Sequence, residues 1–197
     1  MRPNFDCNWR HICVDMQRVF SEDTPWHVAW LQKVLPQVSD VAAHHAERTI
    51  FTRFVPPQDA GLMKGAWRHY YEKWWMMTGR HLPGEMVDLV PELAQFVPPA
   101  MVFDKSVYSP WTSGALQQHL ATQSVSHLVI SGGETDVCVL STVLTAVDLG
   151  YYVTVLTDAV CSCADATHDS ALALFGERFS AHVELKTTER FLQQGFA

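Results

Sequence analysis

The 197-residue chain has no apolar run near the length of a membrane span, and Met1–Trp9 contains no apolar signal-peptide core. It is also short of positive charge. The 14 basic residues are scattered and stand against 21 acidic ones, which gives a net charge of −7. A nucleic acid, like an anionic membrane surface, requires a basic face. We therefore expect neither as a partner.

The sequence contains no C-x-x-C pair, and its cysteines number five, which is odd. This pattern is typical of a reducing compartment, so we expect a cytoplasmic protein. The ordinary role of a free cysteine is that of a small buried apolar residue. Cys161 and Cys163 follow a predicted strand. An inert role is favoured for both, and a place beside a site stays open.

Common cofactor and nucleophile motifs are missing as well. Gly132-Gly133-Glu134 does not match G-x-G-x-x-G, no Walker lysine follows a glycine loop, and no G-x-S-x-G elbow is present. The histidines lack the spacing of a metal site such as H-E-x-x-H. We therefore predict no cofactor and no metal.

The sequence does contain enough apolar material for a sizeable core, since 48% of its residues are hydrophobic and 18% are charged. Its length fits one domain, residues 1–197. The predicted strands are His11–Val14, Thr49–Phe51, Met101–Phe103, His127–Ser131, Tyr152–Thr157 and Ala181–Leu185. The predicted helices are Val28–His45 (with a kink or a later start at Pro36), Thr112–Gln123, Asp136–Leu149, Ala164–Phe175 and Thr188–Gln193. This alternation predicts an α/β fold in which helices cover both faces of a parallel sheet.

One long segment, residues 54–99, interrupts this alternation and is rich in aromatic side chains, among them Trp67, Tyr70, Tyr71 and Trp74. Insertions of this length in a compact α/β domain tend to be functional. The aromatic rings fit a local core, a subunit interface or a ligand pocket, and the sequence does not separate these alternatives.

Three reactive side chains follow predicted strands: Asp15 after the first, Lys105 after the third and Cys138 after the fourth. The carboxyl ends of parallel strands meet at one sheet edge, where ligands bind in open α/β sheets. Each residue alone has a plainer explanation, as a cap, a surface charge or a structural cysteine. Their coincidence at one edge favours an active site.

Cys138 has the strongest physical case. With Asp136 or Thr135 as N-cap, it falls in the first turn of a helix, where the dipole favours a thiolate. A nearby Lys105 ammonium is expected to lower its pKa further. A thiolate beside free backbone N–H groups can carry out acyl transfer, because those groups hold an oxyanion.

Five stretches of the sequence carry a resemblance to a known family: Val14-Asp15-Met16-Gln17, Asp104-Lys105-Ser106, Gly132-Gly133-Glu134-Thr135-Asp136-Val137-Cys138-Val139, Ala146-Val147-Asp148-Leu149-Gly150-Tyr151 and Leu156-Thr157-Asp158-Ala159. They resemble the isochorismatase-like cysteine hydrolases, and the resemblance weakens across residues 54–99. It implies a Rossmann-like three-layer αβα fold with a mostly parallel six-stranded sheet. It also implies a triad of Asp15, Lys105 and Cys138, and a cis peptide near Gly133–Glu134 that turns backbone N–H groups toward the substrate.

The resemblance also separates branches of the family. Isochorismatases proper are similar but lack the cysteine at the position of Cys138. Nicotinamidases add a metal held by an acid and histidines after the second strand, whereas Thr52–Asp59 contains no histidine. The chain is most similar to the metal-independent amidohydrolase branch, which includes N-carbamoylsarcosine amidohydrolase and biuret hydrolase.

We therefore expect a cysteine hydrolase that cleaves a C–N bond of a small amide, carbamoyl or lactam-type substrate through a thioester. The backbone N–H groups of Val137 and Cys138 are expected to hold the oxyanion. The expected substrate-binding residues are Gln17, Phe20, Tyr108, Trp111 and Thr135, with packing an equal alternative for the first four. A vinyl-ether hydrolase, a nicotinamidase-like amidase and a binding protein without turnover are the alternatives. We also expect a homo-oligomer, a dimer or a tetramer.

Overall fold

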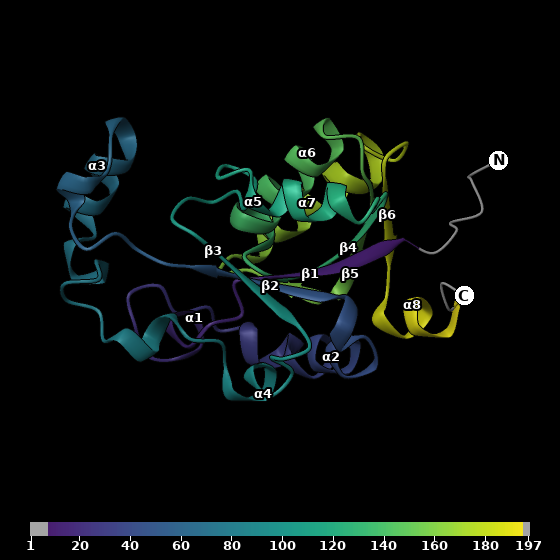
Figure 1. Ribbon diagram of the computed structural model, residues 1–197, viewed down its shortest axis with the longest axis horizontal. Helices are drawn as coiled ribbons and strands as arrows, with labels where there is room; N and C mark the ends of the chain where they lie inside the picture. The colour runs from purple at the N-terminus through teal and green to yellow at the C-terminus, as the bar shows by residue number, and fades with distance from the viewer. Residues whose placement is uncertain (1–7, 195–197) are drawn as a thin grey trace.

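The computed structural model describes residues 8–194 and contains one six-stranded parallel sheet (Figure 1). The strands are β1 (Trp9–Val14), β2 (Thr49–Phe54), β3 (Met101–Lys105), β4 (His127–Gly133), β5 (Tyr152–Cys161) and β6 (Val183–Lys186). Their order across the sheet is β3-β2-β1-β4-β5-β6, and every neighbouring pair is parallel. The order reverses between β1 and β4, which is the point where ligands bind in sheets of this type.

Helices cover both faces of the sheet (Figure 1). One face carries α2 (Leu31–His44), α4 (Pro91–Ala94) and α8 (Thr188–Gln194), and the other carries α5 (Ala115–Thr122), α6 (Leu140–Asp148) and α7 (Asp165–Glu177). Successive strand residues point to opposite faces, so Cys13 packs in the first of these two cores and Ile12 in the second. The predicted α/β three-layer class is confirmed, with the sheet wholly rather than mostly parallel.

Several predicted boundaries were wrong. β5 runs four residues beyond the predicted end at Thr157, past a register shift in its pairing with β4. The first long helix begins at Leu31, and Pro36 lies inside it. The predicted helix Asp136–Leu149 is divided, because a π-helical turn, η5 (Thr135–Val139), precedes α6.

The segment after β2 contains short helices that sequence periodicity did not reveal. They are η2 (Ala60–Leu62), α3 (Gly65–Lys73), η3 (Trp75–Met77) and η4 (Gly84–Val87). Two further short helices, α1 (Arg18–Ser21) and η1 (Ala46–Arg48), precede β2. We call residues 60–87 the aromatic lobe. Figure 1 places it beyond the carboxyl ends of the strands, away from the sheet. α4, at the end of the predicted insertion, packs on the sheet instead, with Leu93 fully buried.

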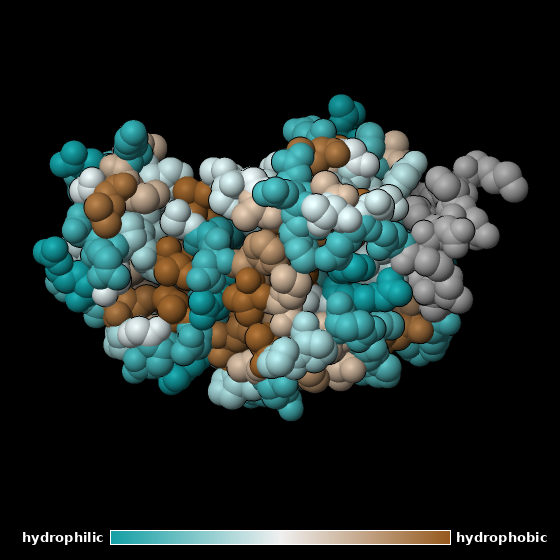
Figure 2. All heavy atoms as spheres, in the orientation of Figure 1, coloured by the Kyte–Doolittle hydropathy of each residue, from teal (hydrophilic) through white to brown (hydrophobic). Residues whose placement is uncertain are grey.

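Aromatic rings pack against one another within the lobe. The ring centroids of Trp67 and Tyr70 lie 5.3 Å apart, and those of Tyr70 and Tyr71 lie 5.1 Å apart. Trp67 also contacts Tyr108 on the main body at 4.7 Å. On the face shown in Figure 2, hydrophobic spheres gather mainly between the lobe and the body of the domain. The lobe is thus a local aromatic core that lies against the sheet domain.

In residues 8–194, the helices are too short or too polar to cross a lipid bilayer.

Gly132 permits the close approach of β1 and β4 at the switch point. Its φ is +102°, and a Cβ there would lie 2.1 Å from the Val14 carbonyl oxygen. We expect Gly132→Ala to destabilise the protein by about 4 kcal/mol or more, because the added Cβ would clash with the backbone of Val14 in the neighbouring strand β1. The measurement is urea unfolding. Gly114→Ala is the matched control, since φ is +76° there but nothing lies near the added Cβ. It should cost only about 1–2 kcal/mol. Equal losses in the two variants would contradict the clash.

Candidate active site

Asp15, Lys105 and Cys138 come together at the carboxyl edge of the sheet. Asp15 follows β1, Lys105 ends β3, and Cys138 lies in η5 after β4. Lys105 Nζ is 2.6 Å from Asp15 Oδ2 and 3.5 Å from Cys138 Sγ. All three residues are buried, at 1%, 7% and 7% exposure respectively. The sheet topology therefore produces the three-residue cluster that the sequence predicted.

The Asp15 carboxylate is held from two sides. The Thr52 hydroxyl donates a hydrogen bond of 2.6 Å to Asp15 Oδ1, while Lys105 pairs with Oδ2. The backbone N–H of Asp15 donates to the Thr52 carbonyl at 3.2 Å, and its φ is +51°. Left-handed backbone is strained for a residue with a Cβ, although Asp tolerates it better than most. Asp15 adopts this conformation directly after β1, where its carboxylate pairs with Lys105.

Lys105 is positioned by four contacts. Besides Asp15 and Cys138, its Nζ donates to the Val107 carbonyl at 3.2 Å and lies 4.9 Å from the centroid of the Phe54 ring. Burial disfavours the ammonium, but the Asp15 carboxylate and the Cys138 sulfur outweigh this effect and raise the pKa of Lys105. The lysine is therefore a fixed cation between the carboxylate and the sulfur.

The surroundings of Cys138 favour the neutral thiol over the thiolate. Burial and the neighbouring Asp15 carboxylate raise its pKa, and Lys105 offsets only part of that rise. The sequence predicted a lowered pKa from the helix start and Lys105, whereas burial and Asp15 outweigh the lysine and raise it. The predicted cap was also wrong. Glu134 occupies the N-cap position without a side-chain bond, while Asp136 Oδ1 accepts a 2.5 Å hydrogen bond from Ser162.

The chain before Cys138 has a cis peptide bond between Gly133 and Glu134. The Val137 N–H donates to the Glu134 carbonyl at 3.1 Å. That bond occupies the group that the sequence interpretation assigned to the oxyanion, so Val137 is a poor candidate for that role. Its side chain instead borders the cavity described next.

Cys138 opens onto a cavity of about 210 Å³. Its lining residues are Phe20, Pro25, Trp26, His27, Phe54, Tyr70, Tyr108, Glu134, Val137, Cys138 and Cys163. Phe20 and Tyr108 therefore lie where the sequence placed them. The sequence interpretation missed Trp26 and Tyr70 as cavity residues, because their positions depend on the path of two long connections. It also missed Phe54, which could have been predicted because it ends β2 at the same sheet edge.

Three expected substrate-binding residues do not line this cavity. Gln17 is fully buried, and its amide is already saturated by backbone groups of Phe54 and Val87. Trp111 is a core residue whose Nε1 donates to the Thr142 carbonyl at 3.0 Å. Thr135 is fully buried behind the site.

The Thr135 hydroxyl donates to the Cys161 carbonyl at 3.1 Å and contacts His168 Nδ1 at 2.9 Å. The two later cysteines differ from each other. Cys161 is buried, and its Sγ would lie 3.1 Å from a Cβ added at Gly133, whereas Cys163 is exposed and lines the cavity. Cys161 therefore packs behind the strand end, and only Cys163 borders the site.

Gln17 is a structural clamp between the end of β2 and the aromatic lobe. Its Oε1 accepts the Phe54 N–H at 2.6 Å, and its Nε2 donates to the Phe54 and Val87 carbonyls at 3.1 and 2.7 Å. We expect Gln17→Leu to lower the free energy of unfolding by about 3 kcal/mol, because several buried backbone groups lose their partners. Urea unfolding measures the loss. Gln118→Leu, on the exposed side of α5, is the control and should change stability little. A loss at Gln17 no larger than at Gln118 would contradict the clamp.

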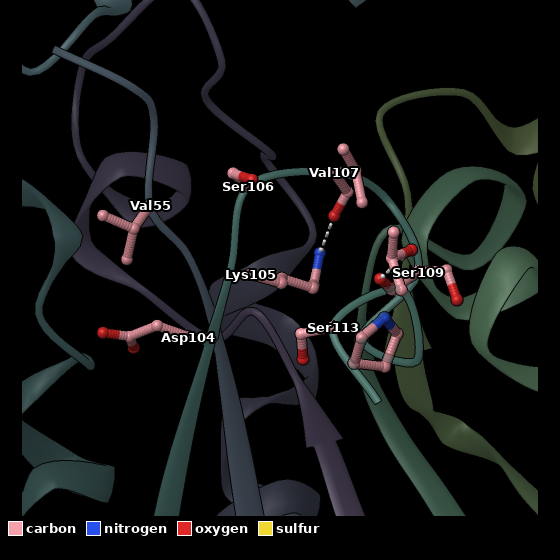
Figure 3. A pocket seen from close by; sticks show the side chains of 9 residues that line it. Val55, Asp104, Lys105, Ser106, Val107, Ser109 and Ser113 are labelled. Carbon is pink, nitrogen blue, oxygen red and sulfur yellow. Dashed lines mark hydrogen bonds between the residues drawn. The ribbon is translucent and has the colours of Figure 1, made fainter. Parts of the chain in front are cut away.

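A second, larger cavity of about 370 Å³ lies beside β3, and its lining includes four residues with hydroxyl groups, Ser106, Ser109, Thr112 and Ser113. Figure 3 shows Asp104 and Lys105 pointing in opposite directions from the strand, with Lys105 Nζ directed to the Val107 carbonyl. Ser106, Ser109 and Ser113 surround this space. Cys138 does not line it, so the smaller cavity is the candidate active site.

The residues after β2 do not form a metal site. Arg53 at the end of the strand pairs with Asp104 and Asp88, at 2.8 and 3.2 Å. Across residues 8–194, no three His, Cys, Asp or Glu side chains are grouped closely enough to hold a metal ion. The donor set of residues 8–194 therefore does not fit a resident metal.

Comparisons with known proteins agree with this geometry. A cysteine hydrolase from Pseudomonas syringae pv. phaseolicola 1448A is 24% identical, with a TM-score of 0.80 over 98% of this chain and 93% of that one. A pyrazinamidase/nicotinamidase from Streptococcus mutans UA159 is 23% identical, with a TM-score of 0.73 over 89% and 99%. An N-carbamoylsarcosine amidase from Thermoplasma acidophilum is 16% identical, with a TM-score of 0.73 over 92% and 97%.

At these identities the structures share the fold with this chain. No curated protein sequence matches it. The family model of the isochorismatase domain matches residues 11–187, which is most of the chain. The chain therefore belongs to the isochorismatase family of hydrolases.

Proposed function

We propose that the protein is a cysteine-dependent amidohydrolase that cleaves a C–N bond of a small amide, carbamoyl or lactam-type substrate. The observation that carries the proposal is the placement of Cys138. Its sulfur faces a cavity on one side and lies 3.5 Å from Lys105 Nζ on the other, and Lys105 is paired with Asp15. A nucleophile, a base and a fixed cation in contact meet the requirements for covalent acyl transfer.

The first half of the reaction forms a thioester. Because Cys138 rests as a thiol, its proton passes to the Asp15 carboxylate as the sulfur attacks the substrate carbonyl carbon. Lys105 stabilises the negative sulfur during this transfer. The Cys138 N–H, at the start of the helix, is the candidate oxyanion donor. In comparable sites such a donor contributes about 3–4 kcal/mol. Asp15 then gives its proton to the departing nitrogen, and the C–N bond breaks.

The second half regenerates the enzyme. A water molecule gives its proton to Asp15 and attacks the thioester carbonyl. The carbon–sulfur bond breaks, and the sulfur regains a proton from Asp15. The products are a carboxylic or carbamic acid and ammonia or an amine, and for a lactam the acid and the amine remain in one ring-opened molecule. Each step uses side chains that are in contact in the resting structure.

A screen for ammonia or amine release over small amides, ureides and lactams tests the proposal. Mass spectrometry of the protein during turnover should detect the acyl group on the peptide that contains Cys138. Treatment with iodoacetamide should abolish turnover. Vinyl-ether hydrolysis by acid catalysis at Asp15 is the competing activity in this family. Turnover that survives complete alkylation of Cys138 would favour it over the amidohydrolase.

A further inference from the structure

We propose that the cavity at Cys138 selects amides that also carry a positive charge, such as a quaternary or protonated amine. This inference rests on the proposed function and narrows its substrate class. It comes from five aromatic rings in the cavity wall, which we call the aromatic cage: Phe20, Trp26, Phe54, Tyr70 and Tyr108. The face of an aromatic ring is negative and attracts a cation within about 6 Å of its centroid.

The rings of the cage are neighbours and share one space. The Trp26 ring lies 6.3 Å from Phe20, 5.7 Å from Phe54 and 6.1 Å from Tyr70, measured between centroids. Tyr70 lies 6.4 Å from Tyr108. The planes of Trp26 and Phe54 are inclined at 77°, and those of Tyr70 and Tyr108 at 88°. Phe20 and Trp26 are stacked, with planes inclined at only 17°, so the ring planes of the cage take more than one orientation around the cavity.

One cation already lies against this cage. Lys105 Nζ is 4.9 Å from the centroid of Phe54, although the same ammonium pairs with Asp15. The ring face thus lies within the range in which a cation is attracted. The remaining rings of the cage have no such partner among the residues that the structure describes in this wall.

Glu134 supplies a negative charge at the same cavity. It lines the cavity, and its Oε2 accepts the Cys163 N–H at 3.2 Å. Burial raises the pKa of Tyr70 and of Tyr108, and the Glu134 carboxylate raises both further. Both phenols therefore stay neutral. A cation in the cage would gain from this carboxylate as well as from the rings.

An anionic substrate would find little to bind. The described residues of the cavity wall include no arginine and no lysine. Lys105, behind the wall, is already paired with Asp15. His27 Nδ1 lies 2.9 Å from the Glu22 carbonyl, which only accepts, so Nδ1 carries the proton there. In the neutral ring, His27 Nε2 is then an acceptor and adds to the preference for a cation.

The test compares two thiol reagents of opposite charge, because their reaction needs no knowledge of the substrate. The reagents are 2-(trimethylammonium)ethyl methanethiosulfonate and 2-sulfonatoethyl methanethiosulfonate. Their rates at Cys138 are followed by mass spectrometry of its peptide, and each is divided by the rate with free 2-mercaptoethanol. We expect the cationic reagent to be favoured by about tenfold or more. Glu134→Gln should reduce that ratio several-fold, and Trp26→Leu should reduce it as well.

Glu92→Gln, on the exposed side of α4, is the matched control, and the ratio should not change there. Turnover gives a second readout: 4-(trimethylammonio)butyramide should be hydrolysed with a lower KM than the neutral amide in which a tert-butyl group replaces the trimethylammonium. A ratio near one in the native protein, or a ratio unaffected by both Glu134→Gln and Trp26→Leu, would overturn the charge preference. Those results would leave amide hydrolysis standing. By contrast, turnover by Cys138→Ala would refute the proposed function while leaving the binding preference measurable with tetramethylammonium by tryptophan fluorescence.

Discussion

Replacing Cys138 by alanine should lower the rate of amide hydrolysis by roughly 10⁴-fold or more, a loss comparable to nucleophile removal in other covalent hydrolases. The physical reason is that no other nucleophile lies against both Lys105 and the cavity in the part of the chain that the structure describes. The measurement is ammonia release under single-turnover and steady-state conditions. Cys138→Ser should be almost as inactive, because a hydroxyl is a much weaker nucleophile than a thiol that loses its proton to Asp15 as it attacks.

The other thiol at this cavity gives the matched comparison. Cys163 lines the same space, but its Sγ lies 3.4 Å from the His27 carbonyl rather than beside Asp15 and Lys105. Cys163→Ala should therefore cause a far smaller loss of activity than Cys138→Ala. Circular dichroism and urea unfolding should show that both variants fold. An active and folded Cys138→Ala protein, or equal losses at the two cysteines, would contradict the assignment of the nucleophile.

The arrangement of Asp15, Lys105 and Cys138 was open to prediction because topology alone determines it. Each residue follows a strand, and parallel strands bring their carboxyl ends to one edge. The chain order of apolar runs was enough to identify those strands, although not their exact ends. The protonation of Cys138 was not open to prediction, since it depends on burial and on the distance to Asp15, neither of which periodicity contains.

Side-chain direction explains most of the errors at the site. Gln17 and Trp111 lie close to the sheet edge in sequence, but their side chains turn into the protein and bond to backbone. Tyr70 lies far from every strand in sequence and still reaches the cavity, because the aromatic lobe folds back against Trp26 and Tyr108. Contacts of this kind are set by the tertiary path of a long connection, which a single sequence does not specify.

The ion pair between Asp15 and Lys105 should couple stability to catalysis. Its atoms are 2.6 Å apart, and both side chains are almost fully buried. Removing one partner of a buried pair leaves the other charge without compensation, at a cost of about 3–5 kcal/mol. We therefore expect Asp15→Asn and Lys105→Met each to lower the free energy of unfolding by about that amount, measured in urea. Both variants should also lose hydrolysis, because the base or the fixed cation is missing.

The double variant Asp15→Asn/Lys105→Met separates the two effects. With both charges removed, no uncompensated ion remains in the interior, so the double variant should be more stable than the sum of the single losses predicts. It should nevertheless remain inactive, because it lacks both the base, Asp15, and the fixed cation, Lys105, even where its stability is recovered. The half-buried surface pair Arg18–Glu22, 2.6 Å apart, is the control, and Glu22→Gln should cost less than about 1 kcal/mol. Additive losses in the double variant would mean that the two charges are not energetically coupled. Activity in the double variant would mean that proton transfer at Cys138 does not pass through Asp15.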